Sequence, residues 1–242
     1  MTHAHDFSDS FAFEATLTVD PAADAVTSAV AHKGLAPAVM LPPNACFAES
    51  LEQFSRISAA QKNILIHFWA PPWPLHHHME SRPFADLPEM DVSFRAPDLQ
   101  ATIAATNDEL ALGLLSALAP AINRAHELCG GKHMRMTLGK LRDRMCPLFH
   151  VDRLLLRMIC TLRGPGTEWL DDREVQRANL GKGSNAAIVT PGATIYQLGQ
   201  FQIGLLKGEE FAGSRRRGVV HRSPAVASTS DGRWYFRLDI TA

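Results

Sequence analysis

Long apolar runs and paired cysteines are both missing from this chain of 242 residues. No stretch reaches the roughly 18 apolar residues that a membrane-spanning helix needs, and the N-terminus lacks a basic region followed by an apolar one. The sequence therefore predicts no secretion signal and a cytoplasmic location. The four cysteines form no Cys-x-x-Cys pair, which argues against a zinc ribbon or a disulfide framework. They are Cys46, Cys129, Cys146 and Cys160.

Basic residues are scarce in the first part of the chain. Residues 1–131 contain 6 Lys and Arg against 15 Asp and Glu, whereas residues 132–242 contain 18 against 10, which gives −9 and +8 within a total of −1. A basic part suits either nucleic acid or an anionic small molecule. Aromatic residues do not alternate with the basic cluster Arg215–Arg217, as single-strand binding usually requires. We therefore expect no nucleic-acid partner, and no membrane partner either.

The part before residue 131 is predicted to be helical and rich in proline. Residues 21–33 fit a helix, residues 63–69 a short strand, and residues 71–97, with six prolines, an irregular connector. A longer helix is expected to begin near Asn107, to be kinked or split at Pro120, and to end at Gly130 and Gly131.

After Gly131 the apolar pattern changes from a period of about 3.6 residues to a period of about 2. Short alternating segments separated by Gly and Pro turns predict a sandwich or a barrel. We expect an α+β protein in which residues 1–131 pack on a barrel formed by residues 132–242, as a separate domain or as a supporting layer. The expected strands are 134–141, 154–162, 186–190, 194–198, 202–206, 218–221 and 234–240.

The strongest chemical signal is His150 and Asp152, followed by His221. Residues i and i+2 of a strand point to the same face, so His150 and Asp152 can reach one point in space. A second imidazole from a later strand completes a 2-His-1-carboxylate triad. That triad leaves coordination positions open for a co-substrate and dioxygen, and it is typical of non-haem Fe(II) oxygenases. The same ligands suit Zn(II), which is the alternative metal.

The last predicted strand has one polar and one apolar face, because Arg233, Tyr235, Arg237 and Asp239 alternate with apolar residues. Arg233 stands 12 residues after His221. There its guanidinium fork is expected to hold the remote carboxylate of 2-oxoglutarate at the wet mouth of the barrel. The reserve candidates for this carboxylate are Arg237 on the same face, Arg222 beside the histidine, and Tyr196 on a middle strand.

These residues resemble two groups of proteins. Fe(II)/2-oxoglutarate-dependent oxygenases of the prolyl-hydroxylase type have a similar core, which implies that residues 132–242 form a double-stranded β-helix, a jelly-roll or cupin-like barrel. The matching segments are His150–Asp152, Arg157–Leu162, His221 and Gly232–Tyr235. A bacterial family of unknown function, whose genes often lie near zinc metallochaperones, is similar in further segments. These are Phe149–Asp152, Gly164–Leu170, Leu205–Glu209 and Val220–Ala225.

We interpret the chain as an Fe(II)/2-oxoglutarate-dependent oxygenase that hydroxylates an unknown small molecule or protein. The alternatives are a non-catalytic protein of zinc binding or zinc homeostasis with the same three ligands, and a cupin-like binding module. Arg233 favours the oxygenase, because a zinc site needs no cation on the last strand. Cys146 is interpreted as a buried structural thiol, and His76–His78 as part of a loop without a ligand role.

Overall fold

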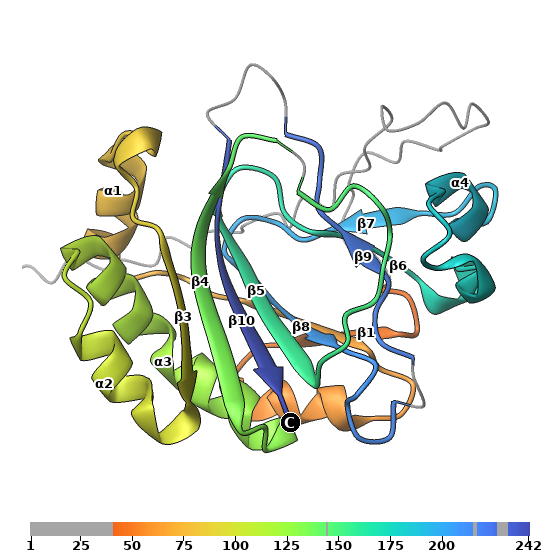
Figure 1. Cartoon of the computed structure of the whole chain (residues 1–242), viewed down its shortest axis with the longest axis horizontal. Coiled ribbons are helices and arrows are strands. Elements are labelled where there is room, and N and C mark those ends of the chain that lie inside the picture. Colours follow the sequence, from red (N-terminus) through yellow and green to blue (C-terminus); the bar gives the residue numbers. More distant parts are fainter. Residues whose placement is uncertain (1–40, 144, 215–216, 227–231) are drawn as a thin grey trace, which may run out of the picture.

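Two β-sheets face each other, and helices cover the outer side of the larger sheet (Figure 1). The computed structural model describes residues 41–143, 145–214, 217–226 and 232–242. The helix predicted at residues 21–33 lies outside these ranges. Within them the fold is mixed α+β, as predicted. None of the helices described here is both long enough and apolar enough to cross a bilayer.

The larger sheet has seven strands in the order β1-β2-β8-β5-β10-β4-β3. Neighbouring strands are antiparallel, except for the parallel pair β1 and β2. The last of the described strands, β10, lies between β5 and β4. The strands are β1 (Ala45–Ala48), β2 (Ile64–Phe68), β3 (Met90–Arg95), β4 (His133–Leu141), β5 (Leu156–Arg163), β8 (Gln202–Lys207) and β10 (Arg233–Thr241).

The smaller sheet is antiparallel and has the order β7-β6-β9. Its strands are β6 (Glu168–Leu170), β7 (Ile195–Gln197) and β9 (His221–Arg222). Trp169 of β6 is fully buried and packs in one apolar cluster with Ile159 and Leu206 of the larger sheet. This cluster holds the smaller sheet over the part of the larger sheet that contains β5 and β8.

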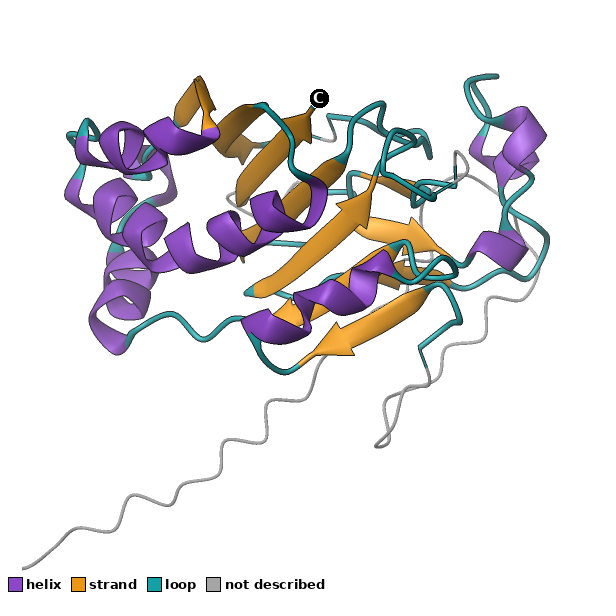
Figure 2. Cartoon of the chain, turned by 90° about the horizontal axis from the view of Figure 1, so that it is seen from below, coloured by secondary structure: helices purple, strands orange, loops and turns teal. Residues whose placement is uncertain are grey.

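Helices α1, α2 and α3 lie on the other side of the larger sheet, whereas α4 lies beyond the smaller sheet (Figures 1 and 2). They are α1 (Trp73–Ser81), α2 (Leu99–Ala104), α3 (Glu109–Cys129) and α4 (Asn185–Ile188). Short 3-10 turns occur at Leu51–Ser58, Phe84–Asp86, Ala96–Asp98, Asp172–Glu174 and Arg177–Asn179. The main core lies between α3 and the sheet, where Leu114, Leu118 and Ile122 pack in one cluster with Met136 and Phe236.

The alternation predicted for the last strand is present in β10. Trp234, Phe236, Leu238 and Ile240 are fully buried in the main core with the helices. The residues between them point to the opposite face, toward the smaller sheet and the space beside it. One strand thus joins the apolar core to the polar face that carries the candidate site.

The prediction of an irregular connector at residues 71–97 is wrong, because this segment contains α1 and β3. Its prolines stand at the ends of these elements: Pro72 is the N-cap residue of α1, and Pro88 and Pro97 flank β3. Helix starts and strand flanks do not use the missing N–H, so proline is tolerated there.

Two further segments differ from the local rules. Of the kink or split expected at Pro120, the split is absent: helix α3 runs unbroken through this proline, because the residues around it are buried against the sheet and packing outweighs the lost hydrogen bond. The strand expected at residues 186–190 is instead α4, whose first turn is capped by the Ser184 hydroxyl, which accepts from Ala187 N at 3.3 Å.

The part before residue 131 is not only helical, since it supplies β1, β2 and β3 of the larger sheet. Strand β2 pairs with β8, and β3 pairs with β4. The larger sheet is therefore shared by the two parts of the chain that the sequence separates at residue 131.

Asp108 caps α3, and replacing it with Ala should lower the free energy of unfolding by about 1–2 kcal/mol. Its carboxylate accepts from Ala111 N at 2.9 Å and pairs with Arg82 at 2.8 Å. Urea titration measures the loss. Asp98→Ala is the matched control, because Asp98 precedes α2 without a side-chain capping bond. Equal losses in both variants would contradict the capping role of Asp108.

The same variant has an expected pH dependence. Burial works against the charge of Asp108, but Arg82 and the helix N–H groups hold its pKa below the usual value. A carboxyl with a lowered pKa stabilises the fold above its unfolded pKa of about 3.9, and this contribution is lost as the pH falls below it. The stability difference between wild type and Asp108→Ala should therefore shrink in acid.

Candidate metal centre

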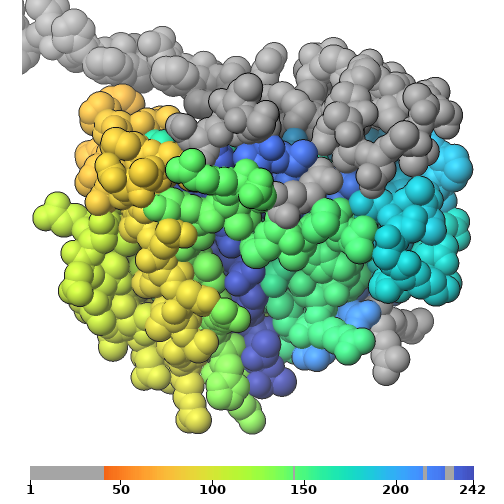
Figure 3. Space-filling model, turned by 45° about the horizontal axis from the view of Figure 1, so that its top comes forward, coloured from red at the N-terminus to blue at the C-terminus, as the bar shows by residue number. Residues whose placement is uncertain are grey.

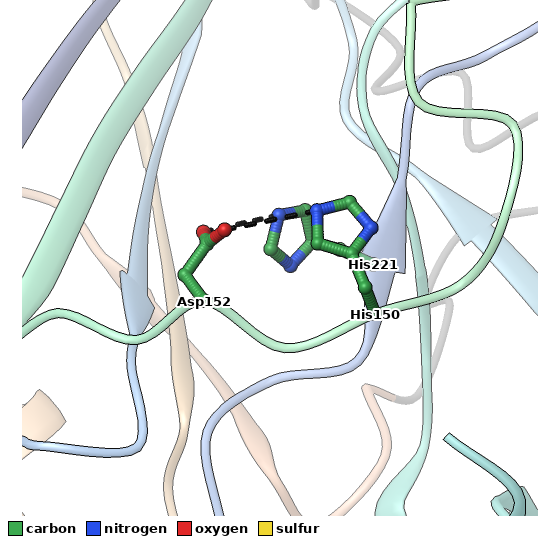
Figure 4. Close-up of side chains that lie close together, drawn as sticks. All are labelled: His150, Asp152 and His221. Carbon is green, nitrogen blue, oxygen red and sulfur yellow. Dashed lines mark ion pairs between the residues drawn. The ribbon is translucent and has the colours of Figure 1, made fainter. Parts of the chain in front are cut away.

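The backbones of His150 and His221 form an isolated antiparallel bridge, in which each N–H donates to the other carbonyl at 3.0 Å. His221 belongs to β9, whereas His150 lies in the segment between β4 and β5. The bridge places the two imidazoles side by side, with ring centroids 4.6 Å apart. Asp152 follows outside any strand. The predicted strand is thus a single bridge, yet His150 and Asp152 still face the same point (Figure 4).

The three side chains converge as a metal site requires (Figure 4). His221 Nε2 lies 3.3 Å from Asp152 Oδ2, and His150 Nε2 lies 3.7 Å from Asp152 Oδ1. One ligand atom from each residue lies within 4.8 Å of the others. Two ligand atoms about 2.1 Å from a metal and at right angles are about 3 Å apart. Small side-chain movements would therefore bring all three atoms to coordination distance.

Hydrogen bonds to the backbone fix the tautomer of both histidines. Nδ1 of His150 lies 2.9 Å from Leu148 O, and Nδ1 of His221 lies 3.2 Å from Val219 O. Because a carbonyl only accepts, Nδ1 carries the hydrogen, and in the neutral ring Nε2 then keeps its lone pair. Both Nε2 atoms face Asp152. A ligating histidine commonly donates its other N–H to such a carbonyl, so the two rings fit a metal.

Arg157 of β5 lies beside the cluster and connects it to β10. Its Nη1 is 2.6 Å from Asp152 Oδ2 and 3.5 Å from His221 Nε2. Its Nε and Nη2 donate to the two carboxylate oxygens of Asp239 at 2.6 and 3.1 Å. The contact with Asp152 has the distance of an ion pair but not the geometry of a hydrogen bond, so the buried Oδ2 accepts none. The oxygen is therefore ion-paired with Arg157 but has no hydrogen bond, which fits a ligand atom of a cation.

The charges of the cluster suit a metal ligand set. Burial alone would raise the pKa of Asp152, but His221, Arg157 and His150 together hold it below the usual value. Burial, reinforced by His221, lowers the pKa of His150. A carboxylate and a neutral imidazole are the forms that bind a metal.

A cavity runs from the histidines between the two sheets to Arg233, and Arg157, Thr167 and Arg237 also line it. Arg233 is 2% exposed, so it is buried and does not stand at a wet mouth as predicted. Its Nη2 donates to Thr161 Oγ1 at 3.2 Å and to Thr167 Oγ1 at 2.8 Å, and its buried Nε has no partner. Within the described ranges no carboxylate forms an ion pair with it. Burial lowers the pKa of Arg233 to about 10, which leaves it charged at neutral pH.

The two reserve arginines line the same cavity but have other partners. Arg237 donates to Thr137 Oγ1 at 3.2 Å, and its Nε lies 3.4 Å from Asp239 Oδ2. Arg222 is 1% exposed and pairs with the buried Glu168 at 2.5 Å. This pair links β9 to β6, so the charge of Arg222 is already balanced.

Other sequence candidates lie elsewhere. Tyr196 stacks on Trp169, with centroids 4.6 Å apart, and does not line the cavity as the prediction requires. Cys146 is exposed, not buried, and stands at the cavity wall. The histidines 76–78 belong to α1 and not to a loop, and two of them stack on Trp73. In the basic cluster only Arg217 is described, and it pairs with Asp172 at 3.7 Å.

The sequence does not predict the ion pair between Arg157 and Asp239. Both lie on polar positions of alternating strands, which the sequence shows, and they are opposite each other in the register of β5 and β10. Strand order and register depend on tertiary contacts, so no local pattern identifies this pair.

The protein is a candidate metal-dependent protein of mixed α+β fold. Its two sheets face each other, its His-Asp-His group converges, and arginines line the cavity beside that group. The chain belongs to the family described as "Protein of unknown function (DUF1826)", whose model matches residues 50–239. No curated protein matches the sequence.

Several solved structures are similar in shape. The rice dioxygenase for auxin oxidation has 15% identity and a TM-score of 0.48, with 82% of each chain covered. Dioxygenase for auxin oxidation 1 from Arabidopsis thaliana, in complex with 2-oxoglutarate, has 12% identity and a TM-score of 0.45, with 84% of this chain and 93% of that chain covered. A full-length Neurospora crassa protein in complex with alpha-KG has 10% identity and a TM-score of 0.40, with coverage of 79% and 78%. These likenesses are remote, so none assigns an activity to this chain.

The geometry predicts one divalent metal per chain, bound by His150, Asp152 and His221. Replacing any one of them with Ala should abolish stoichiometric binding, because two ligands rarely hold such a metal in water. Metal content after loading with Fe(II) without oxygen measures the effect. His78→Ala is the control, since this exposed histidine of α1 lies outside the cluster. Full metal occupancy in two of the three variants would exclude the site.

Proposed function

We propose that this protein is an Fe(II)/2-oxoglutarate-dependent oxygenase and that its two facing sheets form a double-stranded β-helix. One observation carries the proposal: the cavity that begins at the His-Asp-His group contains a buried arginine without a carboxylate partner among the described residues. The group fits a metal at one end, and Arg233 fits an anion at the other.

The state of Arg233 favours a carboxylate ligand. A charged group that is buried without a partner costs several kcal/mol, so buried charges are normally paired. Two threonine hydroxyls orient the guanidinium, but hydroxyls carry no charge to balance it. A dicarboxylate whose keto-acid end reaches the metal and whose other end reaches Arg233 satisfies both ends of the cavity. 2-Oxoglutarate has this form.

The residues of the chain hold and orient the reactants. His150, Asp152 and His221 would hold Fe(II), while Arg157 keeps the carboxylate of Asp152 in place through Asp239. When bound, Fe(II) supplies the reaction of dioxygen with 2-oxoglutarate and a C–H bond, which gives succinate, carbon dioxide and an alcohol. The apolar cluster around Trp169 keeps water away from one side of the cavity.

The alternatives leave Arg233 without a role. A zinc-binding protein or a cupin-like module needs the three metal ligands, but it has no need for a buried arginine that points into the same cavity. Arg222 shows the contrast: it is a buried arginine with a structural role, and the carboxylate of Glu168 neutralises its charge. Arg233 lacks such a carboxylate among the described residues, which supports a ligand role.

Titration of 2-oxoglutarate into Fe(II)-loaded protein without oxygen tests the proposal. We expect the metal-to-ligand charge-transfer band of the chelated keto acid. Arg233→Met should keep the metal content and weaken 2-oxoglutarate about tenfold to a thousandfold, since a charge-assisted bidentate pair is lost. Arg233→Lys should recover part of the affinity, because an ammonium cannot reproduce the fork.

Arg237→Met is the matched control on the same face of β10, and it should keep the band. Absence of the band in the wild type would refute the oxygenase. A band lost in Arg237→Met but kept in Arg233→Met would preserve the function and move the carboxylate contact to Arg237.

A further inference from the structure

Four consecutive apolar residues are exposed directly before the candidate metal centre. They are Met145, Cys146, Pro147 and Leu148, and His150 follows two positions later. Met145 is 47% exposed and Leu148 is 40% exposed. Protein surfaces normally avoid apolar runs of this length unless the run has a function. We call Met145–Leu148 the entrance segment. It belongs to the connection between β4 and β5 (green in Figure 3), which lies at the surface of this face.

Hydrogen bonds hold the backbone of the entrance segment while its side chains stay in solvent. Cys146 O accepts from Ser223 N, just after β9, at 3.0 Å. Pro147 O accepts from Asn185 Nδ2 at 2.9 Å, and Oδ1 of the same asparagine accepts from Phe149 N at 2.8 Å. Phe149 itself is buried in an apolar cluster. A fixed backbone thus presents the exposed side chains, which lowers the entropy cost of binding a ligand.

The entrance segment adjoins the accessible side of the metal ligands. The side chain of His150 is 34% exposed, whereas those of Asp152 and His221 are 14% and 5% exposed. Solvent therefore reaches the three ligands mainly past His150. Leu148 O lies 2.9 Å from Nδ1 of His150, and Met145 lines the cavity that contains this histidine. A molecule on the entrance segment would therefore lie on the side from which the metal centre can be reached.

The charges of the cavity favour an uncharged molecule. Three of the four arginines that line it have carboxylate partners, and 2-oxoglutarate balances the fourth, Arg233, in the proposed complex. Each arginine then has a carboxylate neighbour, so none is left to bind an anionic substrate. The same arginines repel a cation.

We propose that the substrate of the oxygenase is a small, uncharged molecule whose apolar body lies on Met145 and Leu148 of the entrance segment. This inference rests on the proposed function. The entrance segment has four residues, whereas a protein partner usually contacts about 20–30 residues, so a small molecule fits it better. A C–H bond of the substrate takes up one atom of dioxygen, and the other atom enters succinate.

Three probes with a phenyl ring and a two-carbon arm test the substrate class: ethylbenzene, phenylacetate and 2-phenylethylammonium. The full chain is labelled with ¹³C in its methionine methyl groups, loaded with Zn(II), and titrated with and without 2-oxoglutarate. The signal of Met145 is assigned by its loss in Met145→Leu. We expect ethylbenzene to shift this signal and to bind at least about tenfold more tightly than either ion, because the ions lose hydration without gaining a partner.

Variants of exposed residues locate the site. Met145→Gln with Leu148→Gln should weaken ethylbenzene about tenfold, because roughly 60 Å² of apolar contact is lost. The ¹H signals of the probe give this affinity. Leu112→Gln is the matched control, since it alters an exposed leucine of α3 outside the cavity, and it should change nothing. An unmoved Met145 signal, equal or tighter binding of either ion, or an unchanged affinity in the double variant would overturn the proposal.

Competition separates this site from that of 2-oxoglutarate. Ethylbenzene should bind while 2-oxoglutarate is present, and mutual exclusion would overturn the proposal, because the probe would then occupy the place of the co-substrate. The charge-transfer band reports the proposed function independently. Ethylbenzene at Met145 without the band would leave an apolar site beside the histidines and refute the oxygenase. The band without ethylbenzene at Met145 would refute only the substrate class.

Discussion

The candidate metal centre depends on two backbone hydrogen bonds between His150 and His221. These bonds attach the segment that leads into β5 to the smaller sheet, so two histidines 71 positions apart share one register. Side-chain contacts alone would leave each imidazole on an independent segment. The bridge fixes the distance between the rings, and the carbonyls of Leu148 and Val219 then fix which nitrogen faces Asp152.

The charge asymmetry of the sequence acquires a physical meaning in the structure. Arg157, Arg222, Arg233 and Arg237 all belong to the basic part of the chain, and all of them line the cavity between the sheets. Four of the 18 basic residues that suggest a nucleic-acid surface therefore line an internal cavity. Three of these arginines have carboxylate neighbours at 3.4 Å or closer, and only Arg233 keeps an unbalanced charge among the described residues.

The sequence predicts most of the strands after residue 131 from local rules, but it misses β6 and expects a strand where α4 lies. The spacing of His150 and Asp152 is also local, whereas the third ligand, His221, joins them only through a long-range bridge. Alternation marks β10, and the His-x-Asp spacing places two ligands on one side. It does not predict β3 or α1, where proline at element ends resembles a connector. It also places Arg233 at the wet mouth of the barrel, since the strand pattern shows that Arg233 lies on the polar face but not that this position is buried. The Arg157–Asp239 pair depends on strand register and is absent from any local pattern.

The position of β10 in the larger sheet has a consequence for synthesis of the protein. Of the seven strands of this sheet, β10 is made last, yet it lies in the interior, where β5 and β4 each bond to one of its edges. Until residues 233–241 leave the ribosome, β4 and β5 present unpaired inner edges and the apolar core lacks four of its side chains. The larger sheet therefore closes only after all its other strands have emerged, and the nascent chain exposes aggregation-prone edges until then.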